Sequence, residues 1–435
     1  TFRIIITSPR SGTSPTELFD TVPHTEAIWN WAGTYERAYG FGRKFKVGIS
    51  SEPTDDINAG IQDLGFVAQL QKGEHGFKVY CGGGMGRDPG LGMVISHFIP
   101  EKEIIRYVQA AIDLFFEHGN RKVRPKARLR FVLQEIGPEA FRHLFFQYLE
   151  EADAPDCHPL PIDYSRQLHK PEAGPTPPPN GFEEWQQRSV QPTSCGEEIK
   201  AAKLYVRHGN VNSVELKKLA VLLDKTGIHE IRATSTQDIL IPLIHTSALP
   251  GLFSELKNNL STVINVAGSF SGQIISCIGA TACPIGLLQT EKVRERIAQA
   301  MNALSRTFPD LDPAAYESII AGIHLSGCAS SCGLNQVAAI GLHGHKKRVA
   351  GEVAEFFQLH LGGLIHEKGH NLGCTGEQWL IPVDEVAPAV SALVQVYLQQ
   401  APESQSLTEF MASKRPSLES LAEFSISQVV QILEN

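Results

Sequence analysis

The sequence has little that points to a membrane, a nucleic acid or a second large charged partner. No apolar run approaches the roughly 18 residues that a membrane span needs. Lys+Arg 39 against Asp+Glu 47 leaves a net charge of −8, without long runs of one sign. We therefore expect neither a membrane nor a nucleic acid as a partner. At 435 residues the chain is long enough for two or three domains with separate cores.

Fingerprints of nucleotide cofactors are missing as well. Residues 82–86 read Gly-Gly-Gly-Met-Gly, which lacks the Lys-Ser/Thr of a P-loop and does not fit the G-x-G-x-x-G of a dinucleotide fold. Glycines let a backbone approach a large planar ligand closely, and we expect that use here. Because no flavin or nicotinamide site is present, electrons for redox chemistry must come from a separate protein.

A secretory signal pattern is also absent, and the chain begins at Thr1. Eight cysteines without such a signal favour a reducing compartment, where clustered thiols bind metals or do redox chemistry. We expect a cytoplasmic protein, with a plastid as the alternative. Cys81, Cys157, Cys195 and Cys374 are scattered singly, which is typical of structural thiols.

Two parts of the chain resemble each other. Residues 49–66 match residues 325–342, so that Ser50 faces Ser326 and Gly65 faces Gly341. Further on, residues 98–103 match residues 380–385, and each copy leads into a stretch with helical apolar spacing. In this alignment Glu52 faces Cys328 and Asp56 faces Cys332, so only the second copy has thiols. The repeat predicts two related halves with a site at their pseudo-twofold interface.

Between the halves lies a Pro/Gly-rich segment, residues 171–181, which cannot form a helix or a central strand. After it we expect strands at 203–207, 231–234 and 239–243, and helices at 213–223 and 248–256. The predicted fold is α+β: two duplicated α/β halves and a ferredoxin-like half-domain. The expected divisions are residues 1–165 (first half), 166–195 (linker), 196–262 (half-domain), 263–400 (second half) and 401–435 (C-terminal tail). If the two halves are related by a pseudo-twofold, a second half-domain is expected before the first half, and we expect it to be absent from this chain.

Four cysteines form two pairs, Cys277-x5-Cys283 and Cys328-x3-Cys332. Zinc sites usually pair cysteines two to four residues apart. A five-residue gap with glycines nearby instead suits a larger iron–sulfur cluster, whose iron corners are held by thiolates. We expect such a cluster, with zinc or unliganded thiols as the alternatives.

The second pair reads Ser-Gly-Cys-Ala-Ser-Ser-Cys-Gly over residues 326–333. With the first pair it resembles the siroheme and [4Fe–4S] signature of the assimilatory sulfite and nitrite reductases. The resemblance covers nearly the whole chain and includes residues 43–46 (Arg-Lys-Phe-Lys), 82–84 and 361–363. It implies a [4Fe–4S] cluster on the four cysteines, with Cys332 also a ligand of the siroheme iron. The family usually has Pro and Asn where this chain has Ala329 and Ser330.

The resemblance also implies roles for basic residues. Lys44 and Lys46 alternate with apolar residues, so both are predicted to project from one face of a strand. By resemblance they bind and protonate the substrate anion together with Arg3, although the pattern alone also fits a solvated strand edge. Siroheme has many carboxylates, and a protein that buries these carboxylates must pair them with cationic side chains. The residues predicted to bind it are Arg121, Arg124, Arg128, Arg232, Gln237 and Cys332.

The implied reaction is six-electron reduction of a small oxyanion, with ferredoxin or a flavoprotein as the electron donor. Family members tend to have Lys at the position of Lys46 when they reduce sulfite and Asn when they reduce nitrite. Sulfite reduction to sulfide is therefore favoured over nitrite reduction to ammonia. A third hypothesis is the oxygen-dependent ring-contracting enzyme of cobalamin synthesis, which retention of Lys44 and Lys46 disfavours. A fourth is a non-catalytic electron-transfer or assembly subunit.

Overall fold

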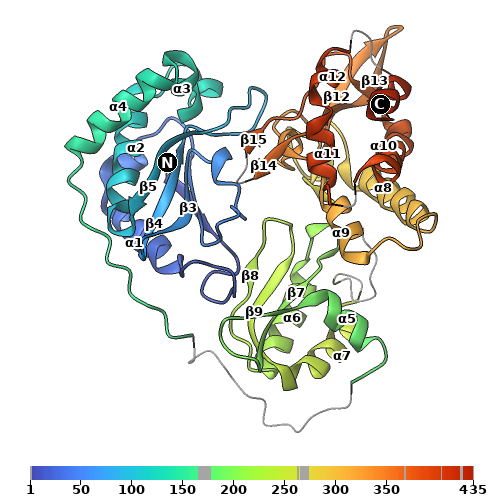
Figure 1. Ribbon diagram of the computed structural model, residues 1–435, viewed down its shortest axis with the longest axis horizontal. Coiled ribbons are helices and arrows are strands. Elements are labelled where there is room, and N and C mark those ends of the chain that lie inside the picture. Colours follow the sequence, from blue (N-terminus) through green and yellow to red (C-terminus); the bar gives the residue numbers. More distant parts are fainter. Residues whose placement is uncertain are drawn as a thin grey trace.

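Three groups of elements, each with its own large hydrophobic core, make up the structure (Figure 1). This computed structural model describes residues 2–164, 178–261, 264, 274–366, 369–402, 404–421 and 425–434. The first half is blue in Figure 1, the half-domain green, and the second half yellow to red. Within these described ranges, no helix is long and apolar enough to cross a membrane.

The first half is a five-stranded mixed sheet with helices packed against it. Its strands are β1 (Phe2–Thr7), β2 (Phe45–Ser50), β3 (Leu64–Gln71), β4 (Glu74–Cys81) and β5 (Met93–Pro100). They lie in chain order, with β1, β2 and β3 parallel and β3, β4 and β5 antiparallel. The helices are α1 (Val22–Thr34), α2 (Ile104–His118), α3 (Leu129–Ile136) and α4 (Pro138–Glu151). The short 3-10 turns are η1 (Glu36–Tyr39), η2 (Ala59–Ile61), η3 (Glu101–Glu103) and η4 (Arg124–Lys126).

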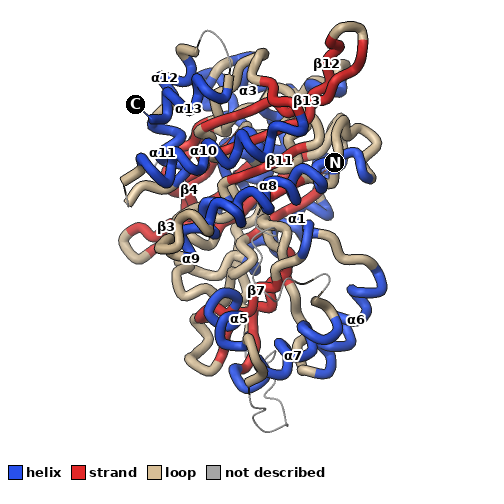
Figure 2. The backbone as a smooth tube through the Cα atoms, turned by 90° about the vertical axis from the view of Figure 1, so that its right-hand side faces the viewer, coloured by secondary structure: helices blue, strands red, loops and turns tan. Residues whose placement is uncertain are grey.

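The second half repeats this topology. Its sheet is ordered β10 (Ile275–Ser276), β11 (Ile323–Ser326), β12 (Ile340–Val349), β13 (Glu352–Leu361) and β16 (Leu380–Pro382). The first two pairings are again parallel and the last two antiparallel. Helices α8 (Thr290–Ser305) and α9 (Pro313–Ala321) lie between β10 and β11 in the chain, and α10 (Val386–Gln400) follows β16; α8 and α10 lie over the strands (Figure 2). The 3-10 turns are η9 (Gly279–Thr281), η10 (Asn335–Val337) and η11 (Val383–Glu385).

The repeat predicted from sequence therefore has a structural counterpart. Strands β5 and β16 both end at proline, run through a 3-10 turn and enter α2 and α10, which are 15 residues each. Helix α2 is buried on most sides and α10 along its apolar residues, and in both helices apolar residues recur at helical spacing. The predicted α+β fold is confirmed.

The half-domain is a four-stranded antiparallel sheet in the order β6 (Val190–Pro192), β7 (Ile199–Leu204), β9 (Ile239–His245) and β8 (Arg232–Ala233). Its helices are α5 (Phe182–Ser189), α6 (Ser213–Lys225) and α7 (Leu249–Asn259), with turns η6 (Arg207–Gly209) and η7 (Thr246–Ala248). Helix α6 begins at a capping box formed by Asn212 and Glu215, which satisfies backbone N–H groups of its first turn.

Three boundaries differ from the sequence prediction. Residues 182–192, assigned to the linker, form α5 and β6, because Phe182 and Trp185 bury their rings in the half-domain core. The strand expected at 203–207 begins earlier and is β7. The expected tail contributes α11 (Leu407–Ser413), α12 (Arg415–Glu419) and α13 (Ile426–Glu434), whose apolar side chains belong to the second core. Residues 165–177, which include most of the Pro/Gly-rich segment 171–181, lie outside the described residues.

The two halves touch near the end of β4. The hairpin of β14 (Leu364–His366) and β15 (Gly369–Asn371) lies between them (Figure 1) and stacks His370 on Tyr80, with ring centroids 4.9 Å apart. The buried Gln336 side chain donates to Gly86 O at 2.7 Å and accepts from Gly86 N–H at 3.3 Å. The glycine-rich loop of the first half is thus tied to the cysteine-containing half.

Candidate cluster and anion site

The four paired cysteines converge at one edge of the second sheet. Cys277 follows β10 and Cys328 follows β11, and because these strands are parallel neighbours their ends lie together. The Gly327 N–H donates to Cys277 Sγ at 3.1 Å, which joins the two segments directly. Burial raises the pKa of the Cys332 thiol, and the charges of the other three thiolates raise it further. The other three thiols therefore lie within electrostatic range of Cys332.

Glycine allows the two cysteine segments to pack this closely. A Cβ on Gly327 would lie 2.7 Å from the Gly279 Cα and from Leu288 O. In the loop between the last two cysteines and η10, Ser331 and Leu334 have left-handed backbones, with φ of 55° and 60°. Non-glycine residues adopt this conformation only where the surrounding structure holds them in it. No three His, Cys, Asp or Glu side chains in the described ranges are grouped closely enough to hold a single metal ion.

Lys44 and Lys46 face these cysteines from the first half. Burial lowers the pKa of Lys44, and the neighbouring charges of Lys46 and Arg128 lower it further, while the Cys332 thiolate raises it. Burial and then Arg128 lower the pKa of Lys46, which Asp63 and Cys332 raise. Lys46 lies on β2, and Lys44 directly precedes it. The two lysines, Arg128 and Cys332 thus share one electrostatic environment, although they come from opposite halves.

A buried ion pair holds this cationic side in place. Arg128 Nε and Nη2 donate to the two carboxylate oxygens of Asp63 at 3.1 and 2.8 Å, and the Asp63 side chain is fully buried. Asp63 also accepts from the backbone N–H of Lys46 at 3.0 Å. A bidentate pair of this kind fixes the plane of the guanidinium.

Arg130 is a residue that the sequence patterns did not single out. Its Nε donates to Asp88 O at 2.8 Å, but its buried Nη1 has no hydrogen-bond partner in the part of the chain that the structure describes. Burial lowers the pKa of Arg130 to about 10, with Arg128 the next cause. A Cβ on Gly84 would lie 2.9 Å from that Nη1 and 3.4 Å from Arg128 Nη2. Gly84 therefore lets the two buried arginines pack closely against the glycine loop, where their positive charge favours an anionic group.

The other predicted site residues hold the protein together in different ways. Arg121 is exposed and donates to Gly40 O at 2.6 Å, and Arg124 is exposed in η4. Arg232 Nη1 donates to Ser11 O at 2.6 Å and to Pro9 O at 3.0 Å. Arg3 is on β1 at an irregular register beside the Phe45–Lys46 stretch of β2, and its side chain lies outside the described part of the structure.

Gln237 acts on the cluster segment itself. Its side chain donates to Ser276 O at 2.7 Å and accepts from Ser276 N–H at 3.1 Å, one residue before Cys277. The residue has a left-handed backbone, with φ of 66°. The half-domain therefore clamps the strand that presents the first cysteine.

A cavity of about 560 Å³ borders the cysteine loop at Ala329. It is lined from the first half by Arg87 and from the second by Gln336, His343 and His360, among others. His343 Nδ1 and His360 Nε2 are 2.8 Å apart, and burial lowers the pKa of these histidines to about 4 and about 3. Both rings are therefore neutral near pH 7, and one donates to the other. Cross-strand pairs of this kind need the register of β12 and β13, which the sequence does not supply.

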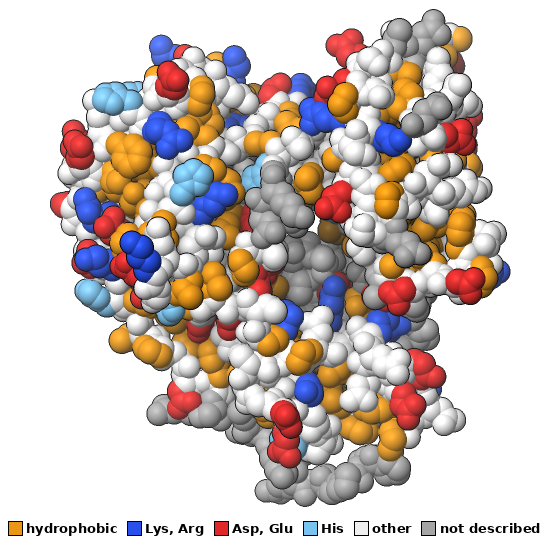
Figure 3. Space-filling view, in the orientation of Figure 1, with side chains coloured by type: hydrophobic (Ala, Val, Ile, Leu, Met, Phe, Trp, Pro, Cys, Tyr) orange, Lys and Arg blue, Asp and Glu red, His pale blue; other side chains and the backbone are white. Residues whose placement is uncertain are grey.

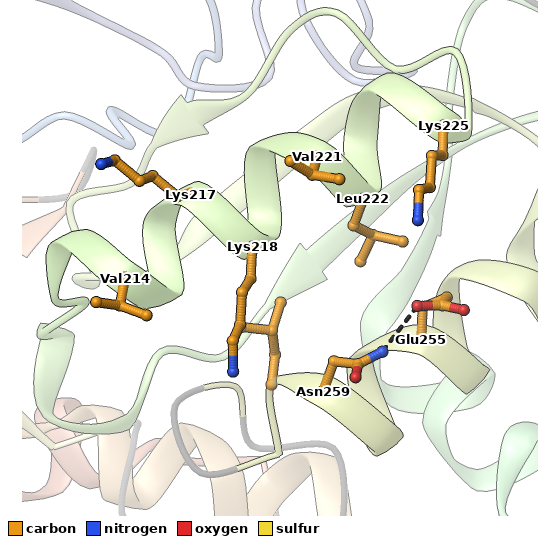
Figure 4. A pocket seen from close by; sticks show the side chains of 9 residues that line it. Val214, Lys217, Lys218, Val221, Leu222, Lys225, Glu255 and Asn259 are labelled. Atoms are coloured by element: carbon orange, nitrogen blue, oxygen red, sulfur yellow. Dashed lines mark hydrogen bonds between the residues drawn. The ribbon is translucent and has the colours of Figure 1, made fainter.

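Elsewhere the surface offers a second hollow. A groove of about 460 Å³ lies between α6 and α7 of the half-domain (Figure 4), lined by Lys217, Lys218 and Lys225 and by apolar residues including Val221 and Leu222. None of the predicted site residues lines it. Figure 3 shows other Lys and Arg side chains around the recess where the three groups of elements meet.

The edge of the first sheet that corresponds to the cysteines is acidic. Glu17 accepts from Gly12 N–H at 2.9 Å. Burial raises its pKa to about 7, opposed by that hydrogen bond and helped by the charges of Asp20 and Glu52. Because the folded-state pKa lies above the ordinary value of 4.5, ionisation of Glu17 costs stability. The cost is absent below pH 4.5, grows between pH 4.5 and 7, and is constant above pH 7.

Glu17→Gln is therefore expected to stabilise the protein by about 1–2 kcal/mol at pH 8, after allowance for partial solvent screening. The gain should shrink at pH 5. Urea unfolding at the two pH values measures it, with exposed Glu26→Gln as a control that changes stability by less than about 0.5 kcal/mol at either pH. A gain for Glu17→Gln that does not depend on pH would contradict the assignment.

Comparison with known proteins places these features in a family. The description "Nitrite and sulphite reductase 4Fe-4S domain" matches residues 1–152, and "Nitrite/Sulfite reductase ferredoxin-like half domain" matches residues 196–259. The chain belongs to the nitrite and sulfite reductase family. Its cofactors are accordingly a [4Fe–4S] cluster and siroheme, as predicted.

Relatives of both substrate types are similar to this chain. A ferredoxin–nitrite reductase of Synechococcus elongatus is 29% identical over 85% of this chain and 67% of its own length. A sulfite reductase [ferredoxin] of Mycolicibacterium paratuberculosis is 26% identical over 90% of this chain and 66% of its own. The solved structure of the Mycobacterium tuberculosis NirA protein has the same fold, with a TM-score of 0.73 at 23% identity, over 94% of this chain and 70% of that one. The chain thus spans about two thirds of the length of these relatives.

The residues present fit these cofactors. Four converging thiols are the ligand set of a [4Fe–4S] cluster. The partnerless Nη1 of buried Arg130, beside the glycine loop, suits a carboxylate-bearing tetrapyrrole. The four thiols belong to the second half and Arg130 belongs to the first.

Proposed function

We propose that this chain reduces sulfite to sulfide in a six-electron reaction, with a siroheme coupled to a [4Fe–4S] cluster. The observation that carries the proposal is the shared electrostatic environment of Lys44, Lys46, Arg128 and Cys332. Cations facing a cluster thiolate across a domain boundary suit an anion that must gain electrons and protons at one place. The family relatives named as sulfite and nitrite reductases support the reaction class.

The cluster ligands are proposed to be Cys277, Cys283, Cys328 and Cys332, with Cys332 shared with the siroheme iron. When bound, this cofactor pair supplies electrons one at a time to the substrate. Gln237 fixes the backbone before Cys277 through its two bonds to Ser276, so it positions a ligand. Residues 263–400 accordingly supply the thiolate side of the site.

Residues 1–165 are proposed to supply the cationic side. Lys44 and Lys46, with Arg3, donate hydrogen bonds to the oxygens of the anion and give protons as these oxygens leave as water. Arg128 adds positive potential, and Asp63 holds both the Arg128 guanidinium and the Lys46 backbone. Arg128 and Arg130 are the cations best buried for siroheme carboxylates. Arg121, Arg124 and Arg232 remain proposed contacts of the same kind.

The electron donor is proposed to be ferredoxin or a similar protein, since relatives are named for it. It is proposed to approach over the cysteine loops, where Ile278, Ile285 and Leu287 expose 48%, 66% and 42% of their surface. Exposed apolar side chains beside a redox centre suit a transient protein contact. A reducing compartment, cytoplasmic or plastid, follows from the same chemistry.

Nitrite is the second candidate substrate, because the 29% identical relative is a nitrite reductase. Turnover with reduced methyl viologen and each anion separates the two. A higher kcat/KM for sulfite is expected, and a higher value for nitrite would reverse the order. Cofactor-loaded protein that reduces neither anion would overturn the proposed function.

The side chain at residue 46 is expected to set this preference. Lys46→Asn removes one cation from the anion site, so the ratio of kcat/KM for sulfite to that for nitrite should fall at least about tenfold. Lys126→Asn, at an exposed position in η4, should leave the ratio unchanged. An equal ratio in Lys46→Asn and the wild-type protein would remove Lys46 from substrate selection.

A further inference from the structure

The loop that holds the cluster cysteines has a twin in the first half, with the same backbone. Asp55 and Asn58 have left-handed backbones, with φ of 57° and 55°, at the positions that correspond to Ser331 and Leu334. The next residues form η2 in the first half and η10 in the second, each a turn of three residues. Two left-handed residues at the same spacing before the same turn are unusual outside glycine.

Backbone hydrogen bonds are repeated as well. Ser8 N–H donates to Ile49 O at 3.1 Å, as Cys277 N–H donates to Leu325 O at 3.1 Å. Three further backbone hydrogen bonds of the first half have counterparts of nearly equal length in the second half. Leu18 N–H donates to Ser51 O as Leu287 N–H donates to Gly327 O, both at 3.0 Å, and Asp55 N–H donates to Glu52 O as Ser331 N–H donates to Cys328 O, both at 3.4 Å. Gly92 N–H donates to Gly60 O at 2.8 Å, as Gly373 N–H donates to Gln336 O at 2.7 Å.

This correspondence assigns a twin to each cluster cysteine. Ser8 and Ser14 stand at the positions of Cys277 and Cys283, with five residues between them and a proline after the second in both halves. Glu52 and Asp56 stand at the positions of Cys328 and Cys332. The hydrogen bond to the side-chain atom at the first ligand position is present in both halves. Ser51 N–H donates to Ser8 Oγ at 2.8 Å, and Gly327 N–H donates to Cys277 Sγ at 3.1 Å.

Hydrogen bonds join two of these four side chains, Ser8 and Asp56. Ser8 Oγ donates to Asp56 Oδ1 at 2.5 Å, and Ser50 Oγ donates to the same oxygen at 2.8 Å. Ser8 and Ser50 are fully buried. Ser50 corresponds to Ser326, which the second half keeps. Direct contacts thus connect the first and fourth ligand positions, which a cluster would otherwise bridge.

We infer that the first half contains a second, cluster-free copy of the [4Fe–4S] cradle, with Ser8, Ser14, Glu52 and Asp56 at the four ligand positions. The Ser8–Asp56 hydrogen bond joins two of its loops where iron–sulfur bonds would hold those of the second half. The match of the 4Fe-4S domain description to residues 1–152, which contain none of the four paired cysteines, agrees with this. The inference rests on the proposed cluster at Cys277, Cys283, Cys328 and Cys332.

Cysteines at the four twin positions should create a second cluster site. The variant S8C/S14C/E52C/D56C, reconstituted anaerobically with iron and sulfide, is expected to hold about eight non-haem iron atoms per chain where the parent protein holds about four. A control variant introduces the same number of thiols nearby without the twin geometry, as S11C/T13C/T21C/T25C, and should hold no more iron than the parent. A parent chain without cluster iron would instead refute the proposed function, so the two failures are distinguishable.

The reverse exchange, in which the first-half residues replace the paired cysteines, tests the inference in a protein without cluster ligands. The variant C277S/C283S/C328E/C332D transfers the first-half residues beside Ser326, and C277A/C283A/C328A/C332A removes the ligands without replacement. Both are compared without iron, and the first is expected to unfold at a higher urea midpoint, by roughly 0.5 M. Equal midpoints, or a folded S8C/S14C/E52C/D56C protein that gains no iron over the parent, overturns the inference.

Discussion

Cys332→Ser is expected to lower kcat/KM for sulfite with reduced methyl viologen by more than about a hundredfold, because changes even in the outer shell of a metal site cost 10–100-fold. Cys332 is the thiol whose environment includes the other three cysteines and both lysines. Its loss removes a proposed cluster ligand and, by the family resemblance, the sulfur that joins the cluster to the siroheme. Activity and the visible absorption spectrum measure the two consequences.

Cys195→Ser provides the matched control. Cys195 is a partly exposed thiol outside the two cysteine pairs, and its Sγ lies 3.8 Å from Gly12 O. Activity and spectrum should stay at wild-type values in this variant. A Cys332→Ser protein as active as Cys195→Ser would show that residue 332 ligates neither cofactor.

Asp63→Asn is expected to destabilise the fold by about 3–5 kcal/mol, since it leaves a buried guanidinium without its counter-charge. Asp63 is fully buried and accepts from Arg128 Nε, Arg128 Nη2 and the backbone N–H of Lys46. The asparagine keeps the shape but removes the charge and one acceptor. Urea unfolding of the two proteins gives the difference in free energy.

An exposed ion pair of equally short geometry separates burial from charge. Arg296 Nη1 and Asp384 Oδ1 are 2.6 Å apart, but the Asp384 side chain is 86% exposed. Asp384→Asn should therefore change stability by only about 0–1 kcal/mol. Equal losses in the two variants would mean that the Asp63–Arg128 pair contributes no more than a surface contact.

The features that follow from the sequence are those written in local patterns. The paired cysteines, the repeated segments and the turn into α2 and α10 are all short-range signals, and the structure has the corresponding sheets in the same order. The tail and the end of the linker were mispredicted because α5, α11 and α13 are short, and their apolar residues become informative only when the core that buries them is known.

Other residues could not be predicted because their roles depend on distant partners. The pairing of His343 with His360 needs the register of β12 against β13. The lack of a hydrogen-bond partner for Arg130 Nη1 depends on the residues that pack around it beside Gly84, and no sequence motif predicts it. The serines at positions 8 and 14 carry no signal alone, and only the shared backbone of the two loops connects them with Cys277 and Cys283.

The most direct test of the central claim is the absorption spectrum of the purified protein, taken together with its iron content. A siroheme coupled to a [4Fe–4S] cluster on Cys277, Cys283, Cys328 and Cys332 predicts bands in the red that a lone cluster lacks, and about five iron atoms per chain. A colourless protein that stays free of iron after reconstitution would contradict the claim.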